Sequence, residues 1–197
     1  MNFVLPGMGA TNAMFSGCWR SLDNTSFLDW PKQTAASSIP ELADELITRH
    51  SMRNGDSMTG TSLGGIVACE IANQLELDQL ILIGAAIDKR EINYFLGKIS
   101  PLVNLTPIHF IQHLTGKIDI PIMQMFAQIE PAFMRTICEA IFRWEGLRSG
   151  IKPFRIHGKH DSVIPIPEKV DLAIDGGHLI AMTHAEECVK AIGQLLL

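Results

Sequence analysis

A serine set among glycines, directly after a short apolar stretch, constrains the fold more than any other feature of this sequence. Gly60 precedes Ser62 by two residues, glycines follow at positions 64 and 65, and an apolar segment then continues to about Leu75. A strand that turns sharply into a helix needs small residues at these positions, because the two backbones nearly touch there. The pattern therefore predicts a strand, a tight turn at Ser62 and a helix.

The spacing of Gly60, Ser62 and Gly64 is that of a nucleophile elbow, in which the turn lifts a serine hydroxyl clear of a sheet. Such a turn holds the serine in strained backbone angles. It also brings the N–H groups of the helix N-terminus beside any negative charge that develops on a substrate. The alternative is an ordinary glycine-rich strand–helix turn without a catalytic serine. The rest of the sequence has to distinguish between these two interpretations.

Composition narrows the class of protein. The chain has 197 residues, which suits one domain, and 47% of them are hydrophobic against 19% charged, as in a globular protein. A net charge of −5 gives no electrostatic reason to expect a nucleic-acid partner. No apolar run reaches the roughly 18 residues of a membrane span, and the N-terminus lacks the basic region of a signal peptide. The scattered Cys18, Cys69, Cys138 and Cys188 suggest reduced thiols and hence a cytoplasmic location.

Short apolar strands alternate with helical patterns at both ends of the chain. We expect strands at 2–5, 26–30, 57–61, 80–83, 153–156 and 169–174, and helices at 13–22, 63–75, 185–196 and from a capping box at Ser38 and Glu41. The run at 80–83 is apolar throughout, as in a parallel strand covered on both faces. This order predicts an α/β fold with three layers, a mostly parallel sheet of about six strands between helices.

Residues 89–149 interrupt that alternation. Helical patterns at 92–99, 108–114, 122–129 and 132–144 are separated by prolines and rich in large apolar side chains. We interpret this segment as a helical lid inserted between two parts of one core, 1–88 and 150–197. The alternative is that it only adds to the core. As a lid, it would place Phe95, Met123 and Phe126 against a substrate.

Ser62, Asp161 and His178 each follow a predicted parallel strand, so all three should meet at one edge of the sheet. Serine, histidine and carboxylate form a catalytic triad when the histidine takes the serine proton and the carboxylate orients the ring. Asp88 follows the strand before the insertion and is the alternative acid. No histidine or cysteine spacing indicates a metal site, and this chemistry needs no cofactor.

A glycine-rich loop follows the first strand, at Pro6-Gly7-Met8-Gly9. Backbone N–H groups in such a loop can face an anion, and we expect those of Met8 and Leu63 to hold the oxyanion, with Gly7 beside the substrate. The alternative is an ordinary connection between a strand and a helix.

Together these motifs resemble the α/β-hydrolase superfamily. The resemblance rests on the loop at residues 5–9, the Ser62 elbow, the His157-Gly158-x-x-Asp161 pattern and Gly177-His178, and it is strongest for a small bacterial branch of esterase- and thioesterase-like proteins. Only one residue precedes the first expected strand, so we expect a sheet without the two N-terminal antiparallel strands usual in the family. The edges of such a small sheet need a cover, from the lid or from a partner such as a second copy in a homodimer.

The resemblance implies a serine hydrolase that cleaves a small-molecule carboxylic ester or thioester. The apolar insertion suggests an apolar acyl group, transferred through an acyl-enzyme intermediate on Ser62. A non-catalytic module that keeps the fold to bind a ligand or a protein is the alternative.

Overall fold

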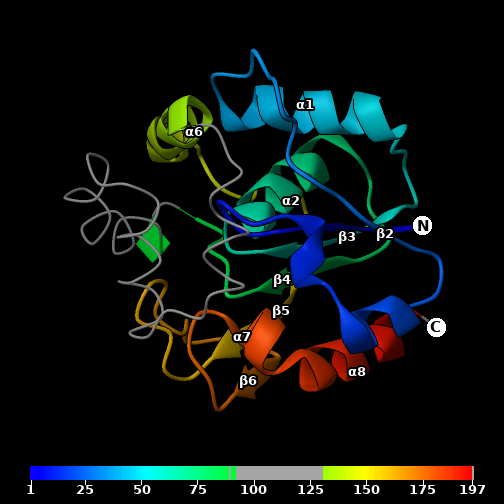
Figure 1. Ribbon diagram of the computed structural model, residues 1–197. Helices are drawn as coiled ribbons and strands as arrows, with labels where there is room; N and C mark the ends of the chain where they lie inside the picture. The colour runs from blue at the N-terminus through cyan, green and yellow to red at the C-terminus, as the bar shows by residue number, and fades with distance from the viewer. Residues whose placement is uncertain (89, 92–130, 197) are drawn as a thin grey trace.

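A six-stranded parallel sheet forms the centre of the protein, seen in a computed structural model that describes residues 1–88, 90–91 and 131–196 (Figure 1). The strands lie in the order β2-β1-β3-β4-β5-β6, and each neighbouring pair is parallel. Their bounds are Asn2–Leu5 for β1, Thr25–Phe27 for β2, Ser57–Thr61 for β3, Leu80–Ile83 for β4, Phe154–Gly158 for β5 and Leu172–Ile174 for β6. The α/β class and the parallel sheet are confirmed.

Helices cover both faces of the sheet and make the three layers (Figure 1). One outer layer holds α1 (Ile39–His50), α2 (Leu63–Gln74) and α6 (Pro131–Arg143). The other holds the 3₁₀ helices η1 (Asn12–Met14) and η2 (Gly17–Ser21) together with α7 (Ile180–Thr183) and α8 (Ala185–Leu195).

Alternating side chains along the strands divide the hydrophobic core in two. On β4, Leu80 and Leu82 pack in the cluster under α1, α2 and α6, whereas Ile81 and Ile83 pack in the cluster with η1, η2, α7 and α8. All four side chains are almost fully buried. Both faces of this strand therefore need apolar residues, which explains its unbroken apolar sequence.

The order of the strands changes direction at β1. From β1 the chain moves to β2 on one side and then returns to β3 on the other, so β1 lies between strands reached in opposite directions. In open parallel sheets, ligands bind at the carboxyl ends of the strands where the order reverses in this way. Leu5 pairs with Gly60 in the β1–β3 register, so the loop after β1 and the turn at Ser62 leave the sheet side by side.

Two predictions near the N-terminus need correction. The expected helix at 13–22 is two short 3₁₀ helices, because Gly17, the first residue of η2, has a φ of 62° that breaks a continuous helical path. The expected strand at 26–30 is the shorter β2. By contrast, the capping box is confirmed, since the Ser38 side chain accepts the N–H of Glu41 at the start of α1.

Near the C-terminus, the strand expected at 169–174 shortens to β6, and a single helical turn, α7, precedes the expected closing helix. The helix expected at 132–144 is present as α6. Those expected at 92–99, 108–114 and 122–129 lie outside the described residues.

The end of α6 is joined to α2 through a buried carboxylate. Glu70 on α2 is 2% exposed and accepts the indole N–H of Trp144 at 2.8 Å and a guanidinium N–H of Arg148 at 3.1 Å. Ile137 and Ile141 of α6 add apolar contacts in the core cluster below. A buried charge is stable only when it is hydrogen-bonded and paired, and Glu70 is both.

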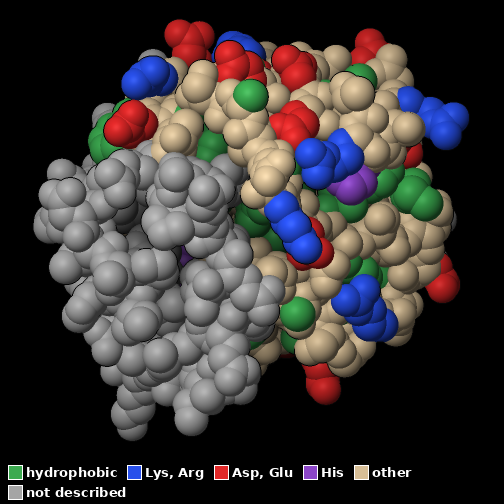
Figure 2. All heavy atoms as spheres, turned by 45° about the horizontal axis from the view of Figure 1, so that its top comes forward, with side chains coloured by type: hydrophobic (Ala, Val, Ile, Leu, Met, Phe, Trp, Pro, Cys, Tyr) green, Lys and Arg blue, Asp and Glu red, His purple; other side chains and the backbone are tan. Residues whose placement is uncertain are grey.

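The surface carries charges of both signs. On the face shown in Figure 2, Lys and Arg side chains are interspersed with Asp and Glu, and neither sign gathers into one patch. Within the described part of the chain, no helix combines the length and the apolar character that crossing a membrane requires.

Candidate active site

Ser62 sits in a strained turn between β3 and α2. Its φ of 53° and ψ of −118° are unusual for a residue with a side chain, and such angles persist only where the surroundings enforce them. An added Cβ at Gly60 would lie 2.3 Å from the carbonyl oxygen of Gly64, and one at Gly64 would lie 2.4 Å from that of Pro6. These glycines let β1, β3 and α2 approach closely enough to hold the turn, as the spacing predicted.

The imidazole of His178 connects Ser62 to a buried carboxylate. His178 Nε2 lies 2.9 Å from Ser62 Oγ, and Nδ1 lies 2.8 Å from Asp161 Oδ2. A carboxylate can only accept, so Nδ1 carries the proton and Nε2 is left to accept the hydroxyl proton of Ser62. The structure thus brings together the three side chains predicted from their positions after strands.

Four N–H groups surround Asp161, whose side chain is fully buried. Oδ1 accepts the peptide N–H groups of Val163 and Ile164, each at 2.9 Å, while Oδ2 faces His178 and His157. Burial by itself would raise the pKa of Asp161, but hydrogen bonds from the two histidines and from the Ile164 peptide hold that pKa well below its ordinary value. The carboxylate therefore stays ionised at neutral pH.

His157 is the second imidazole on this carboxylate, placed by β5. Its Nε2 lies 2.8 Å from the carbonyl oxygen of Ile164 and 3.3 Å from Asp161 Oδ2, and the residue is 1% exposed. Because both neighbouring oxygens are acceptors, the proton must be on Nε2. His157 therefore ties the loop that carries Asp161 back to its own strand.

The loop after β1 lies beside Ser62. Gly7 borders Ser62, since a Cβ added to Gly7 would lie 3.5 Å from the Ser62 Cβ. The indole N–H of Trp30 donates to the Gly7 carbonyl oxygen at 3.0 Å, and Gly9 turns the loop with a φ of 77°. Leu63 is the first residue of α2, where N–H groups have no acceptor within the helix.

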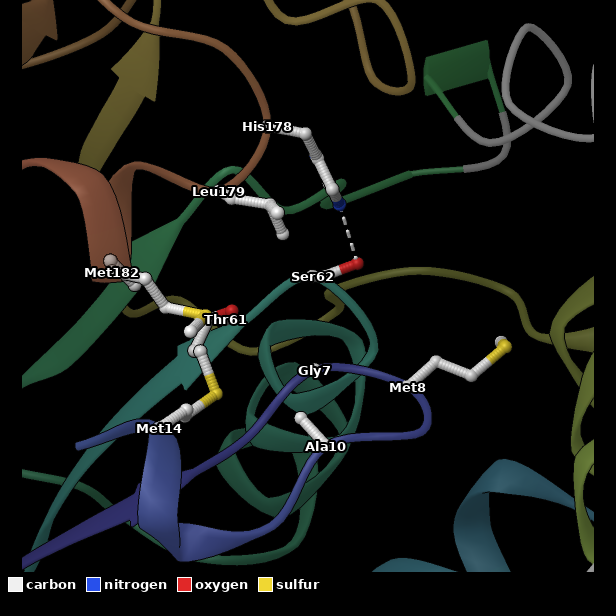
Figure 3. Close-up of a pocket in the computed structure, with 10 residues that line it drawn as sticks. Gly7, Met8, Ala10, Met14, Thr61, Ser62, His178, Leu179 and Met182 are labelled. Atoms are coloured by element: carbon white, nitrogen blue, oxygen red, sulfur yellow. Dashed lines mark hydrogen bonds between the residues drawn. The ribbon is translucent and has the colours of Figure 1, made fainter. Parts of the chain in front are cut away.

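A cavity of about 30 Å³ opens beside Ser62 and His178 (Figure 3). Gly7 and Met8 border it, as do side chains from η1, β3 and α7. Figure 3 shows the side chains of Met14 and Met182 on the same side of Ser62, with Met8 extending the opposite way. Phe95, Met123 and Phe126, predicted to contact a substrate, lie outside the described residues.

Asp88, the alternative acid, and Asp175, which is close to His178 in the sequence, have different partners. Asp88 accepts the backbone N–H groups of Arg90 and Glu91 and pairs with the Arg90 side chain at 2.9 Å. Asp175 pairs with the exposed His160 at 2.9 Å. Among the described residues, His178 is hydrogen-bonded to Asp161 and to neither of these.

Sequence reasoning missed several residues of this site. Trp30 gave no signal, since an indole that binds a distant carbonyl has no recognisable spacing. Met14 and Met182 come from opposite ends of the chain and only the fold brings them together. No group of three or more His, Cys, Asp or Glu side chains in the described ranges could hold a metal ion.

Neither a family model nor any curated protein matches this sequence. Solved structures do match. A thermophilic esterase from Thermogutta terrifontis superposes with a TM-score of 0.74 at 16% identity, over 99% of this chain and 88% of that one. The esterase EaEST from Exiguobacterium antarcticum superposes with a TM-score of 0.70 at 17% identity, over 100% of this chain and 92% of that one.

The N-acyl homoserine lactonase AidH, in a mutant complexed with N-hexanoyl homoserine, gives a TM-score of 0.75 at 14% identity, over 99% of this chain and 87% of that one. Similarity at this low identity concerns the fold. The sheet, the glycine-framed turn at Ser62 and these structural neighbours together show that the chain has the α/β-hydrolase fold.

Proposed function

We propose that this protein is a serine hydrolase that cleaves a carboxylic ester or thioester through an acyl-enzyme intermediate. The observation that carries the proposal is the continuous hydrogen-bonded chain from Ser62 Oγ through His178 to the ionised Asp161. It lies at the carboxyl edge of a parallel sheet, where ligands bind in such folds. Structural neighbours named as esterases and a lactonase support hydrolysis of an acyl–oxygen bond.

In the first half of the reaction, Ser62 Oγ attacks the carbonyl carbon while its proton passes to His178 Nε2. The carbonyl oxygen becomes an oxyanion, which the N–H groups of Met8 and Leu63 would hold. When the intermediate collapses, the bond to the alcohol or thiol breaks and the leaving group takes the proton from His178. The ester of Ser62 remains.

In the second half, water repeats these steps on the acyl-enzyme. His178 Nε2 takes a proton from water as its oxygen attacks the carbonyl carbon, and then returns a proton to Ser62 Oγ as the acid departs. Asp161 keeps its charge throughout and stabilises the imidazolium that forms twice in the cycle.

The test uses p-nitrophenyl esters and a fluorophosphonate, which labels activated serines. Wild type should turn over an ester and gain one adduct on Ser62, located by mass spectrometry. Ser62→Ala should lose about 10⁴-fold or more in kcat and take no label. Ser16→Ala is the matched control, because this exposed serine makes no capping hydrogen bond and its loss should change neither result.

The absence of both turnover and adduct in folded wild type would contradict a serine hydrolase. It would favour a fold kept for binding a ligand or protein.

A further inference from the structure

The cavity beside Ser62 has apolar walls. Besides Ser62, His178 and the bordering glycine loop, it is lined by Ala10, Met14, Thr61, Leu179, Ala181 and Met182. Thr61 supplies the one further polar side chain in this described lining, and no Lys, Arg, Asp or Glu is present. A charged or strongly polar group would lose its hydration here without gaining a partner, so the cavity suits a hydrocarbon group.

The position of the cavity favours the acyl part of an ester over its leaving group. The acyl group stays bonded to Ser62 through both halves of the reaction, whereas the leaving group must depart and water must take its place. Most of the lining is buried, including Met14 at 6% and Ala10 at 4% exposure. An enclosed apolar wall can hold the group that stays, but it would slow the exchange of the group that leaves.

The volume limits how large that group can be. One water occupies roughly 10–15 Å³ by the same measure, and an apolar cavity of roughly 150 Å³ is known to bind a benzene ring. The observed cavity of about 30 Å³ is far smaller. It has room for a short unbranched chain, and a ring or a medium-length chain would have to displace its walls.

Met14 and Met182 bound the cavity at the end away from the Ser62–His178 hydrogen bond, one from η1 and the other from α7 (Figure 3). We propose that this cavity is the acyl pocket, that Met14 and Met182 set its length, and that the preferred substrates are esters or thioesters of short, unbranched acids of roughly two to four carbons. This inference rests on the proposed function.

The experiment compares kcat/KM for p-nitrophenyl acetate, butyrate, octanoate and benzoate in wild type, Met14→Ala and Met182→Ala. Wild type should hydrolyse butyrate at least about tenfold better than octanoate or benzoate, because even one methylene that does not fit can cost that factor. Each methionine variant should move the preference toward octanoate by about tenfold. Met52→Ala is the control, since it removes a buried methionine from the opposite core cluster and should leave the preference unchanged.

Fluorophosphonate labelling of Ser62 keeps the two proposals apart. If Ser62 is labelled but octanoate is the best substrate, or neither methionine variant shifts the preference, the acyl group binds elsewhere and this inference is overturned while the hydrolase remains. If Met14→Ala does not fold, the half-buried Met182 carries the test alone. Failure of both labelling and turnover in wild type would overturn the hydrolase and this inference together.

Discussion

Ser62 and the Asp161–His178 pair reach the same edge of the sheet, but different forces hold them there. Backbone packing holds Ser62, since a Cβ added at Gly60 or Gly64 would lie within 2.4 Å of a backbone oxygen. Hydrogen bonds hold Asp161, which accepts from two peptides and faces two imidazoles. The Ser62 half of the site is therefore held by tight backbone packing. The Asp161 half is held by N–H donors around one carboxylate.

The difference predicts opposite responses to mutation. Substitutions near Ser62 should act mainly on stability, because they force backbones apart. Substitutions around Asp161 should act mainly on catalysis, because the loop can keep its course while the His178 ring loses its proton from Nδ1 to Nε2.

The largest effect we expect around the carboxylate comes from Asp161→Asn. An amide cannot hold the proton on His178 Nδ1 as a carboxylate does, so Nε2 loses its role as acceptor for Ser62. We expect kcat for a p-nitrophenyl ester to fall by about 10³- to 10⁴-fold while the protein stays folded.

Asp88→Asn is the matched control for that change. Asparagine can still cap the chain at this position, and Asp88 has its own partners at Arg90 and Glu91, so activity should stay near wild type. A larger loss in Asp88→Asn than in Asp161→Asn would assign the acid to Asp88.

On the packed side, Gly64→Ala should destabilise the fold by about 3 kcal/mol or more in urea unfolding. Its Cβ would lie 2.4 Å from the Pro6 oxygen and 2.6 Å from the Leu5 oxygen, and neither strand nor helix can move alone. Gly193→Ala in α8 is the control, because its Cβ would meet Leu22 at an ordinary 3.7 Å and alanine favours a helix by roughly 0.5–1 kcal/mol. Equal unfolding midpoints for the two variants would show that the turn is not tightly packed.

These two kinds of support also explain what the sequence could reveal. Glycines at fixed spacing mark the turn at Ser62, and the apolar run at 80–83 marks a buried strand, so both were predicted where they occur. The helix expected at 13–22 was wrong because periodicity does not show that Gly17 takes a positive φ. There the indole N–H of Trp19 donates to the carbonyl oxygen of Ala181, a contact that only the fold creates.

The hydrogen-bonded side of the site was less visible in the sequence. The positions of Asp161 and His178 after strands suggested that they meet, yet the peptide donors at 163 and 164 depend on the course of one loop. A substrate site beside Gly7 was predicted, but Met14 and Met182 in the cavity wall were not, since they come from segments at opposite ends of the chain. Local patterns predict strands and turns well, whereas cavities arise from the packing of distant segments.

A smaller effect on catalysis should come from His157→Phe, which keeps a ring of similar size and removes the donor. The Ile164 carbonyl and Asp161 would each lose a hydrogen-bond partner. Because the loss of one hydrogen bond to a charged group costs roughly 1.5 kcal/mol, we expect kcat to fall about tenfold with little change in KM. His160→Phe, at an exposed side chain, should leave kcat unchanged. A change in KM alone would show that His157 does not support the Asp161 carboxylate.

The smallest expected effect is on stability in acid. The pKa of Asp161 is lower in the folded protein than in the unfolded chain, so the unfolded chain takes up this proton first as the pH falls. The stabilising contribution is therefore complete at neutral pH, begins to be lost below about pH 5 and continues to be lost as the pH falls through the folded pKa, with on the order of 1 kcal/mol gone by about pH 3. Urea unfolding over this range should show a steeper loss for wild type than for Asp161→Asn.

Ser62→Ala sharpens the contrast, because it alters the other half of the site without removing a group that titrates in this range. Its stability should follow the wild-type slope between about pH 5 and pH 3, whatever its absolute value. Parallel slopes for all three proteins would mean that the four donors around Asp161 do not favour its ionised form. The carboxylate would then be held by loop packing, and the two halves of the site would be supported in the same way after all.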